Sequence, residues 1–440
     1  MGSSRVGKLG GGAIGMRKYA GSSSPSTFEW LVAVGALTVQ LNGLAALHWV
    51  MIGESFGPTP AGEVPSSTVN TWAIALSGVL VGSICVRHLR QTTWLALSNP
   101  FAILLTCTIL LSAAWSIYPN ITMRHSASYA LTIVIALYLS GRFEINDVIR
   151  ILSWVSALTL IGSFMFTAAF PEYGIMGGGG WRGVFPHKNR LGLFAAVGVF
   201  IELYMLSVGR PRYAWHFTLL VGHLTLVALS RSATAQLLAL GYLTGVSVYW
   251  FWRQGRRTSV RALGALVVGI CALSALIVLV AEPELALGLV GKDTTLTGRT
   301  GVWVVVLRLI GLKPLFGWGY GAMWLGDRNL RLIGWSPASS HNAFLETALQ
   351  IGLVGTAVLM IFLGIALSRA LRCYLAGGDR LGAFSLIFFI PTMLAGTVEI
   401  TLAQNQNMEW LLFNVLSCSC GLELSRVSAK RSTPVTSVAS

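Results

Sequence analysis

Long apolar runs alternate with short polar stretches along most of the chain. A helix rises 1.5 Å per residue, so about 20 apolar residues cross the hydrocarbon core of a bilayer. By this measure the sequence predicts about twelve spans. They lie near residues 28–52, 69–86, 100–117, 127–139, 148–170, 191–208, 215–229, 233–252, 262–281, 343–367, 381–395 and 407–422. The fourth is short, and Pro391 is expected to break the eleventh.

The polar stretches are rich in Lys and Arg before the first run and again after every second run. Loops with this excess stay in the cytoplasm, so this side is predicted to be cytoplasmic and to hold both termini. The predicted organisation lists five parts: a disordered cytoplasmic tail over 1–27, spans one to nine over 28–281, a large periplasmic loop or lid over 282–340, spans ten to twelve over 341–423 and a cytoplasmic tail over 424–440.

Composition supports an all-α integral membrane protein. The chain is 54% hydrophobic and 11% charged, against about 25% charged residues in soluble domains. The formal net charge of +15 is explained by the positive-inside pattern, so the expected partner is membrane lipid and not nucleic acid. The six cysteines lie in or near apolar runs, and no disulfide framework is expected.

Residues 282–340 form the longest stretch between predicted spans. Loops of this length are usually functional or disordered. Residues 302–310 are strongly apolar but too few to cross a bilayer, which favours a short interfacial or re-entrant helix. A turn rich in glycine and aromatic residues follows at 314–321. We expect this segment to fold over the membrane surface as a lid.

Several basic residues lie on the periplasmic side, against the positive-inside rule. Arg231 falls in the tight connection 229–232 and must lie at the membrane boundary, where an arginine is costly unless it meets an anion. Helix N-termini attract anions, and cations precede or open two predicted helices. These cations are Arg182, Lys188, Arg190 and Arg299. The neighbouring His187 is expected to position other groups.

His341 is the candidate base, because an imidazole accepts a proton from an attacking hydroxyl near neutral pH. Asn342 is expected to orient the ring and Glu346 to face a neighbouring helix. The acidic residues outside the membrane show no metal-ligand spacing. Neither a metal nor another cofactor is therefore expected, and arginines would neutralise phosphate through bidentate contacts. These groups suit a reaction on a lipid-linked phosphate.

The chain resembles the superfamily of O-antigen ligases and O-antigen polymerases. The resemblance is carried by LSRS at 229–232, TGRTGVW at 297–303, PLFGWG at 314–319 and SHNAFLE at 340–346. Upstream, FPHKNR at 185–190 is similar to the basic loop that these proteins carry before a transmembrane helix. The resemblance implies a glycosyltransferase C-like fold.

It also implies transfer of O-antigen polysaccharide from undecaprenyl pyrophosphate to a sugar hydroxyl of the lipid A–core oligosaccharide, in lipopolysaccharide biosynthesis. The reaction would be metal-independent and inverting, on the periplasmic face of a Gram-negative inner membrane. Carried over, His341, Arg299 and Arg231 would be catalytic, with Arg231 and Arg299 on the pyrophosphate and His341 as the base or as a further phosphate contact. The pyrophosphate or glycan would be bound by Arg190, Lys188, Arg182 and Asn342.

Three alternatives stay open from the sequence. An O-antigen polymerase and a protein O-oligosaccharyltransferase belong to the same superfamily, although the short tail after the last predicted span favours the ligase over the protein-directed enzyme. A lipid or ion transporter is the alternative of a different class. It should show charges within its spans or two related halves, whereas the charges here gather at one face.

Overall fold

The computed structural model describes residues 25–41, 68–209, 213–254, 299–324, 339–377 and 380–431. Within these ranges the regular elements are helices, and one isolated bridge joins Ile175 to Trp181. The helices are α2 (Thr27–Gln40), α4 (Thr68–Arg87), α5 (Leu89–Ser98), α6 (Pro100–Leu111), η1 (Ser112–Ala114), α7 (Pro119–Arg142), α8 (Ile145–Ala169), α9 (Pro171–Gly174), α10 (Lys188–Ser207), α11 (Tyr213–Ser230), α12 (Ala233–Gln254), α15 (Arg299–Leu312), α16 (Ala343–Gly377), α17 (Arg380–Ala395) and α18 (Met408–Arg431). The prediction of an all-α protein is confirmed for the described residues.

Four described helices are long and apolar enough to cross a bilayer, namely α8, α10, α11 and α16. The pair Trp72–Arg87 and Leu89–Ser98, bent by 97°, adds a fifth if it forms one broken span. A helix also covers at least part of every other predicted span among the described residues, while the predicted span 262–281 lies outside them. The chain is a multi-pass membrane protein, and the number of spans stays a prediction.

Local rules misjudged three helices. The expected break at Pro391 is wrong, because α17 continues through this proline to Ala395. Its ring packs against Gly241 of α12, where an added Cβ would lie 3.1 Å away, and neighbouring helices commonly support a proline in this way. α7 begins earlier than expected, and the buried Ser126 in its added turns bonds to the backbone oxygen of Ile109 at 3.0 Å. α5 was not predicted at all.

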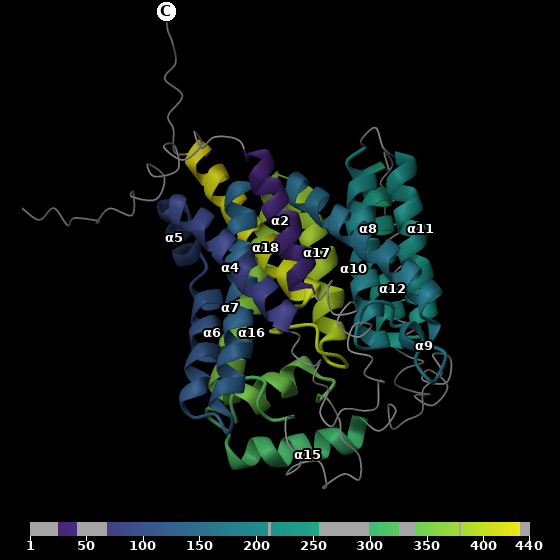
Figure 1. Ribbon diagram of the computed structural model, residues 1–440. Helices are drawn as coiled ribbons and strands as arrows, with labels where there is room; N and C mark the ends of the chain where they lie inside the picture. The colour runs from purple at the N-terminus through teal and green to yellow at the C-terminus, as the bar shows by residue number, and fades with distance from the viewer. Residues whose placement is uncertain are drawn as a thin grey trace, which may run out of the picture.

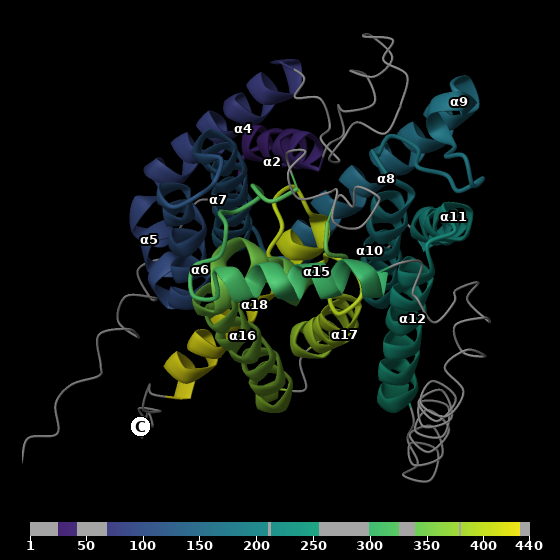
Figure 2. The same ribbon diagram turned by 90° about the horizontal axis from the view of Figure 1, so that it is seen from below.

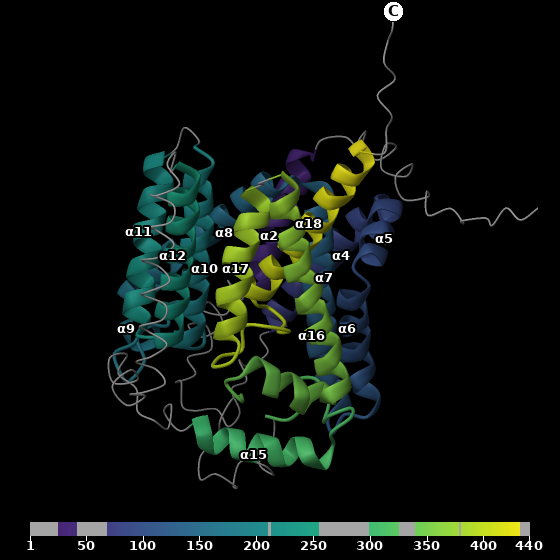
Figure 3. The same ribbon diagram turned by 180° about the vertical axis from the view of Figure 1, so that it is seen from behind.

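The helices form two outer groups with a central group between them. α8, α10, α11 and α12 stand on one side and α4 to α7 on the other, with α2 and α16 to α18 between them (Figures 1 and 3). α10 is buried along nearly its whole length, because α8, α11, α12 and α18 surround it. α15 lies crosswise below one end of the bundle and crosses α16 when seen from below (Figures 1 and 2). The apolar stretch 302–310 is thus helical, as predicted.

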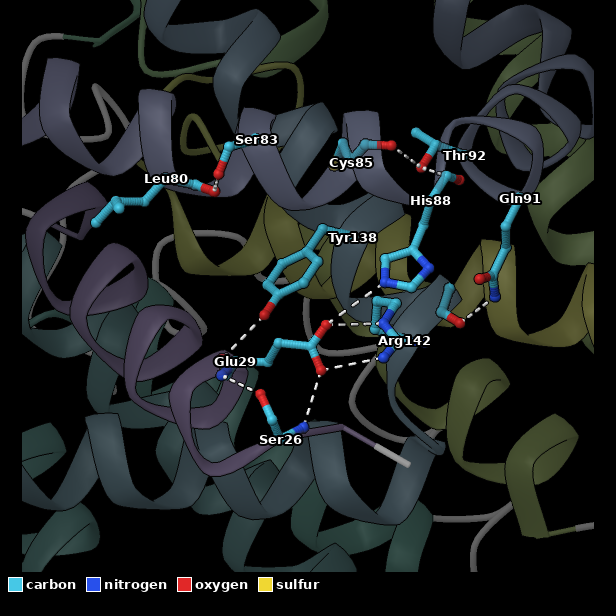
Figure 4. A network of polar contacts seen from close by, with 11 residues as sticks. Ser26, Glu29, Leu80, Ser83, Cys85, His88, Gln91, Thr92, Tyr138 and Arg142 are labelled. Carbon is cyan, nitrogen blue, oxygen red and sulfur yellow. Dashed lines mark hydrogen bonds and ion pairs between the residues drawn. The ribbon is translucent and has the colours of Figure 1, made fainter. Parts of the chain in front are cut away.

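A buried ion pair fastens α2 to α7 at the end away from α15. The Arg142 guanidinium donates to both carboxylate oxygens of Glu29 at 3.0 Å. The Tyr138 hydroxyl donates to the Glu29 backbone oxygen at 2.9 Å, and His88 lies 3.8 Å from the same carboxylate (Figure 4). A buried pair is tolerated when both partners are fully hydrogen-bonded, so this network sets how the two helices meet.

A break in α16 holds the turn that follows α15. Gly352 has φ 71° and ψ −176°, which interrupts the helix. The carbonyls of Leu349 and Gln350 then accept from the N–H groups of Trp318 and Gly319 at 3.0 and 2.9 Å. In the other direction, the Leu353 N–H donates to the oxygen of Pro314 at 2.7 Å. The turn at 314–319 therefore docks into the break and fixes α15 across the bundle end.

We expect Gly352→Ala to destabilise the protein by about 2–6 kcal/mol, the sum of left-handed strain and overpacking. The added Cβ would overlap the backbone of Leu315 and Phe316. Gly364→Ala is the matched control on the same helix, because an added Cβ there meets nothing within 4 Å. Denaturant unfolding in detergent measures both. Equal changes in the free energy of unfolding for the two variants would show that the break in α16 does not contribute to stability.

Candidate functional site

His341 is held in place by a carboxylate from another connection. Its Nδ1 lies 3.0 Å from Oε1 of Glu399, in the turn after α17. The second oxygen of Glu399 accepts from the Asn189 amide, in the first turn of α10, at 2.9 Å. The His341 side chain is 25% exposed and that of Glu399 only 8%. The imidazole is therefore open to a substrate while the group that orients it is shielded.

The residue after His341 is held by hydrogen bonds on both sides of its amide group. Asn342 caps the helix, because its side-chain oxygen accepts from the N–H groups of Phe344 and Leu345 at 3.0 Å. Its amide donates to the Thr397 backbone oxygen at 2.9 Å. The described hydrogen bonds of the Asn342 side chain are thus with the backbone and not with the imidazole ring.

Glu346 ties the same turn to the lid segment. Its buried carboxylate accepts from the Ser340 N–H at 2.8 Å and from the Trp324 indole at 2.7 Å. The Trp303 indole of α15 donates to the Ser340 backbone oxygen at 2.9 Å. Trp303 therefore contacts the turn that carries His341 directly, and Trp324 contacts it through Glu346.

Arg299 begins α15, and its side chain lies outside what the structure describes. Its backbone lies four residues before Trp303, which is about one helical turn or 6 Å. Since Trp303 contacts Ser340, the start of α15 lies close to the turn of His341.

Arg231 is linked to the glycine run that precedes α10. Its guanidinium donates from Nη1 to the Gly178 oxygen at 3.0 Å and remains exposed. The run passes close to the start of α10, since a Cβ on Gly180 would lie 2.8 Å from Lys188 and 2.9 Å from the Ser230 oxygen. These contacts bring Lys188 next to the connection that carries Arg231. The first turn of α10 thus touches the Arg231 connection through Lys188 and the His341 pair through Asn189.

Left-handed backbone gathers at this end of the molecule. Among the described non-glycine residues, positive φ values of 50–52° occur at four positions: Arg231, His341, Ala403 and Gln406. Such residues are uncommon and cost about 1–3 kcal/mol each. All four lie in connections between helices near the start of α10. Strained backbone at this end of the molecule is consistent with residues that are kept because their side chains have a function.

Three polar side chains line one small cavity beside this site. The Asn407 amide nitrogen and Oε1 of Glu409 are buried without a hydrogen-bond partner among the described residues, and the Arg190 side chain lies beside them. All three line a cavity of about 20 Å³, which is room for one water molecule. Donors from Arg190 and Asn407 opposite a carboxylate oxygen suit a hydroxyl group, which both accepts and donates.

Arg182 occupies a different environment from the other predicted cations. It is buried, its Nε donates to the Tyr173 backbone oxygen, and burial lowers the pKa of its guanidinium. His187 caps α10 by accepting at Nδ1 from the Asn189 N–H at 3.2 Å, so that nitrogen carries no proton. No group of three or more His, Cys, Asp and Glu among the described residues is placed to hold a metal ion.

Sequence reasoning did not select Glu399, Asn189 or Glu409. Glu399 lies in the short connection between α17 and α18, Glu409 lies in the first turn of α18, and both are buried. Two acidic residues close together in the sequence, one between two predicted spans and one at the start of the second span, are a signal that the sequence offered. The pairing of Glu399 with His341 depends on how α16 and α17 pack, which no local pattern reveals.

This arrangement selects one tautomer of His341. A neutral imidazole that donates its Nδ1 hydrogen to a carboxylate keeps a lone pair on Nε2. Nε2 forms no hydrogen bond within the described residues. The ring can therefore take a proton from a hydroxyl, and Glu399 would stabilise the cation that results.

Glu399→Gln is expected to lower the turnover number about 10- to 100-fold, the range found when a residue that orients a metal-bound histidine is replaced. The glutamine cannot accept from both His341 and Asn189, because one of its two polar atoms is itself a donor. Turnover of a lipid-linked glycan, with donor KM measured separately, provides the test. Glu172→Gln, on the exposed α9, is the control. An unchanged turnover number would show that Glu399 does not position the base.

Comparison with known proteins points to one family. Residues 216–360 match the O-antigen ligase family, a stretch that contains Arg231, Arg299 and His341. The chain is also similar to the exopolysaccharide production protein ExoQ of Rhizobium meliloti (strain 1021). The two are 26% identical over 296 residues, which cover 64% of this chain and 67% of ExoQ. The resemblance to the O-antigen ligase superfamily that the motifs indicated is confirmed by both comparisons.

Proposed function

We propose that this protein transfers a glycan from undecaprenyl pyrophosphate to a sugar hydroxyl, with His341 as the base. The observation that carries the proposal is the His341–Glu399–Asn189 chain, which presents an imidazole to substrate next to the basic start of α10. The acceptor we assign first is the lipid A–core oligosaccharide, which makes the protein an O-antigen ligase.

The basic side chains at this end of the bundle match the negative charge of the donor pyrophosphate. A pyrophosphate needs charge neutralisation, and helix N-termini and guanidinium groups both supply it. Arg231 and Lys188 lie on either side of the glycine run, and the start of α15 brings Arg299 towards the same end. Arg190 and Asn407 would donate to a hydroxyl of the glycan, and Glu409 would accept from it.

The reaction would be a single displacement. The acceptor oxygen attacks the anomeric carbon, and its proton passes to Nε2 of His341. The bond from the anomeric carbon to the pyrophosphate oxygen breaks, and its electron pair stays on the diphosphate, where Arg231, Arg299 and Lys188 neutralise the charge. Attack opposite the leaving group inverts the anomeric centre.

The topology expected from the sequence places this chemistry in the periplasm. About twelve spans with both termini in the cytoplasm put the connections of Arg231, His341 and Glu399 on the periplasmic side. Residues 282–340 would then form the periplasmic lid, with α15 along the membrane surface. The location would be the inner membrane of a Gram-negative bacterium.

An O-antigen polymerase is the second candidate. The observation that favours it is the similarity to an exopolysaccharide production protein, because an exopolysaccharide grows on a glycan acceptor and not on lipid A–core. The donor and the chemistry at His341 would be the same, and the acceptor alone would differ.

Reconstitution with defined substrates separates these functions. Purified protein in proteoliposomes receives undecaprenyl-pyrophosphate glycan together with lipid A–core. Capped lipid A–core is the product expected of a ligase, whereas lengthened undecaprenyl-linked glycan formed without it would assign a polymerase. Transfer to pilin would assign the protein-directed branch. Breakdown of the donor that yields none of these three products would contradict the proposal.

A further inference from the structure

A second and larger cavity lies at the end of the bundle away from His341. Its volume is about 530 Å³, within the 300–1,000 Å³ typical of ligand pockets. α12, α16 and α18 end around it, and α8 and α17 begin there (Figure 1). Its wall combines apolar residues with two arginines, and the residues used below are Asn146, Arg253, Ala376, Arg380 and Glu423.

Arg380 is the first residue of α17 and has an unmet hydrogen-bonding need. Its Nε is enclosed by protein and has no hydrogen-bond partner among the described residues. A buried guanidinium nitrogen without an acceptor is costly, and the positive end of the α17 dipole adds to the local charge. Both effects are relieved by an anion in the cavity.

The other charged residues leave the cavity positive. Arg253 donates from Nη1 to the Tyr249 hydroxyl at 2.7 Å, which leaves its remaining N–H groups available. Glu423 already pairs with Arg426 at 3.5 Å. Asn146 accepts from the Tyr204 hydroxyl through Oδ1 at 3.0 Å, which leaves its amide N–H groups to donate. Two guanidinium groups, one neutral donor and one carboxylate that is paired with Arg426 therefore line the space.

We propose that this cavity binds the phosphodiester headgroup of an acidic phospholipid from the surrounding leaflet. Its volume of about 530 Å³ is far more than one phosphate fills. The apolar part of the wall suits the glycerol and the start of the acyl chains. Basic pockets between transmembrane helices bind such headgroups. This site is separate from the proposed transfer chemistry and does not depend on it.

Native mass spectrometry tests the proposal on the full-length protein. The purified protein is titrated with dioleoyl phosphatidylglycerol and, in parallel, with dioleoyl phosphatidylcholine. Wild type should retain phosphatidylglycerol preferentially. Each of Arg253→Ala and Arg380→Ala should weaken this retention about fivefold, and the double variant about 25-fold. Arg372→Ala is the control, because this exposed arginine does not line the cavity.

A second variant leaves both arginines in place. Ala376→Phe fills the cavity and should also abolish preferential retention, which separates binding from any loss of folding in the arginine variants. Inorganic phosphate at millimolar concentration distinguishes a free anion from a lipid. Displacement of phosphatidylglycerol by phosphate alone, or equal retention by wild type and the double variant, would overturn the proposal.

Discussion

His341→Asn is expected to fold like the wild type and to lose about 100- to 10,000-fold in turnover number, the range that general-base catalysis supplies. Asparagine is chosen because His341 has φ 50°, a left-handed conformation that asparagine tolerates well. Its amide can still donate towards Glu399, but it offers no basic nitrogen to the acceptor hydroxyl. The loss should therefore appear in kcat, with donor binding preserved.

The measurement is the initial rate of glycan transfer in proteoliposomes at saturating donor and acceptor. His88→Asn provides the control, because His88 lies at the opposite end of the bundle beside Glu29. A His341→Asn variant that retains half of the wild-type rate would remove the imidazole from the mechanism. Unfolding midpoints within error of the wild type would confirm that the variant is intact.

Arg231→Asn is expected to reduce kcat about 100- to 1,000-fold, the effect of removing one donor that stabilises developing negative charge. Asparagine again accepts the left-handed backbone, here at φ 50°. Arg231→Lys restores the charge but not the planar fork, so it should recover only part of the activity. This order, wild type above lysine above asparagine, is what a contact with diphosphate predicts.

Arg308→Asn is the matched control for this series, since Arg308 is an exposed arginine of α15. Rates are compared at saturating donor so that changes in kcat and KM are separated. If Arg231→Lys were as active as the wild type, charge alone would suffice and bidentate phosphate binding would be wrong. If Arg231→Asn were fully active, the arginine would serve only to hold the glycine run through Gly178.

The fold could be anticipated where the information is local. The length of an apolar run predicts a helix, so α4, α8, α10, α11 and α12 begin and end within a few residues of their predicted bounds. α5 has too little apolar character to stand out. The helix through Pro391 was missed because packing against Gly241 outweighs the lost backbone hydrogen bond.

The residues of the candidate site could likewise be predicted only where the information is local. Arg231 and His341 could be selected because residue type and topology both mark them, and the structure finds both in left-handed turns. Glu399 pairs with His341 across 58 residues, a contact that only the packing of α16 and α17 creates. The docking of the turn at 314–319 into the break at Gly352 is likewise a tertiary contact.

The central claim is that the donor pyrophosphate lies between the Arg231 connection and His341. A cryo-electron microscopy structure of the protein with bound undecaprenyl pyrophosphate tests it most directly. We predict diphosphate density within hydrogen-bonding distance of Arg231 and Lys188, with the glycan-bearing end towards Nε2 of His341. Diphosphate density at the opposite end of the bundle, between Arg253 and Arg380, would contradict the claim.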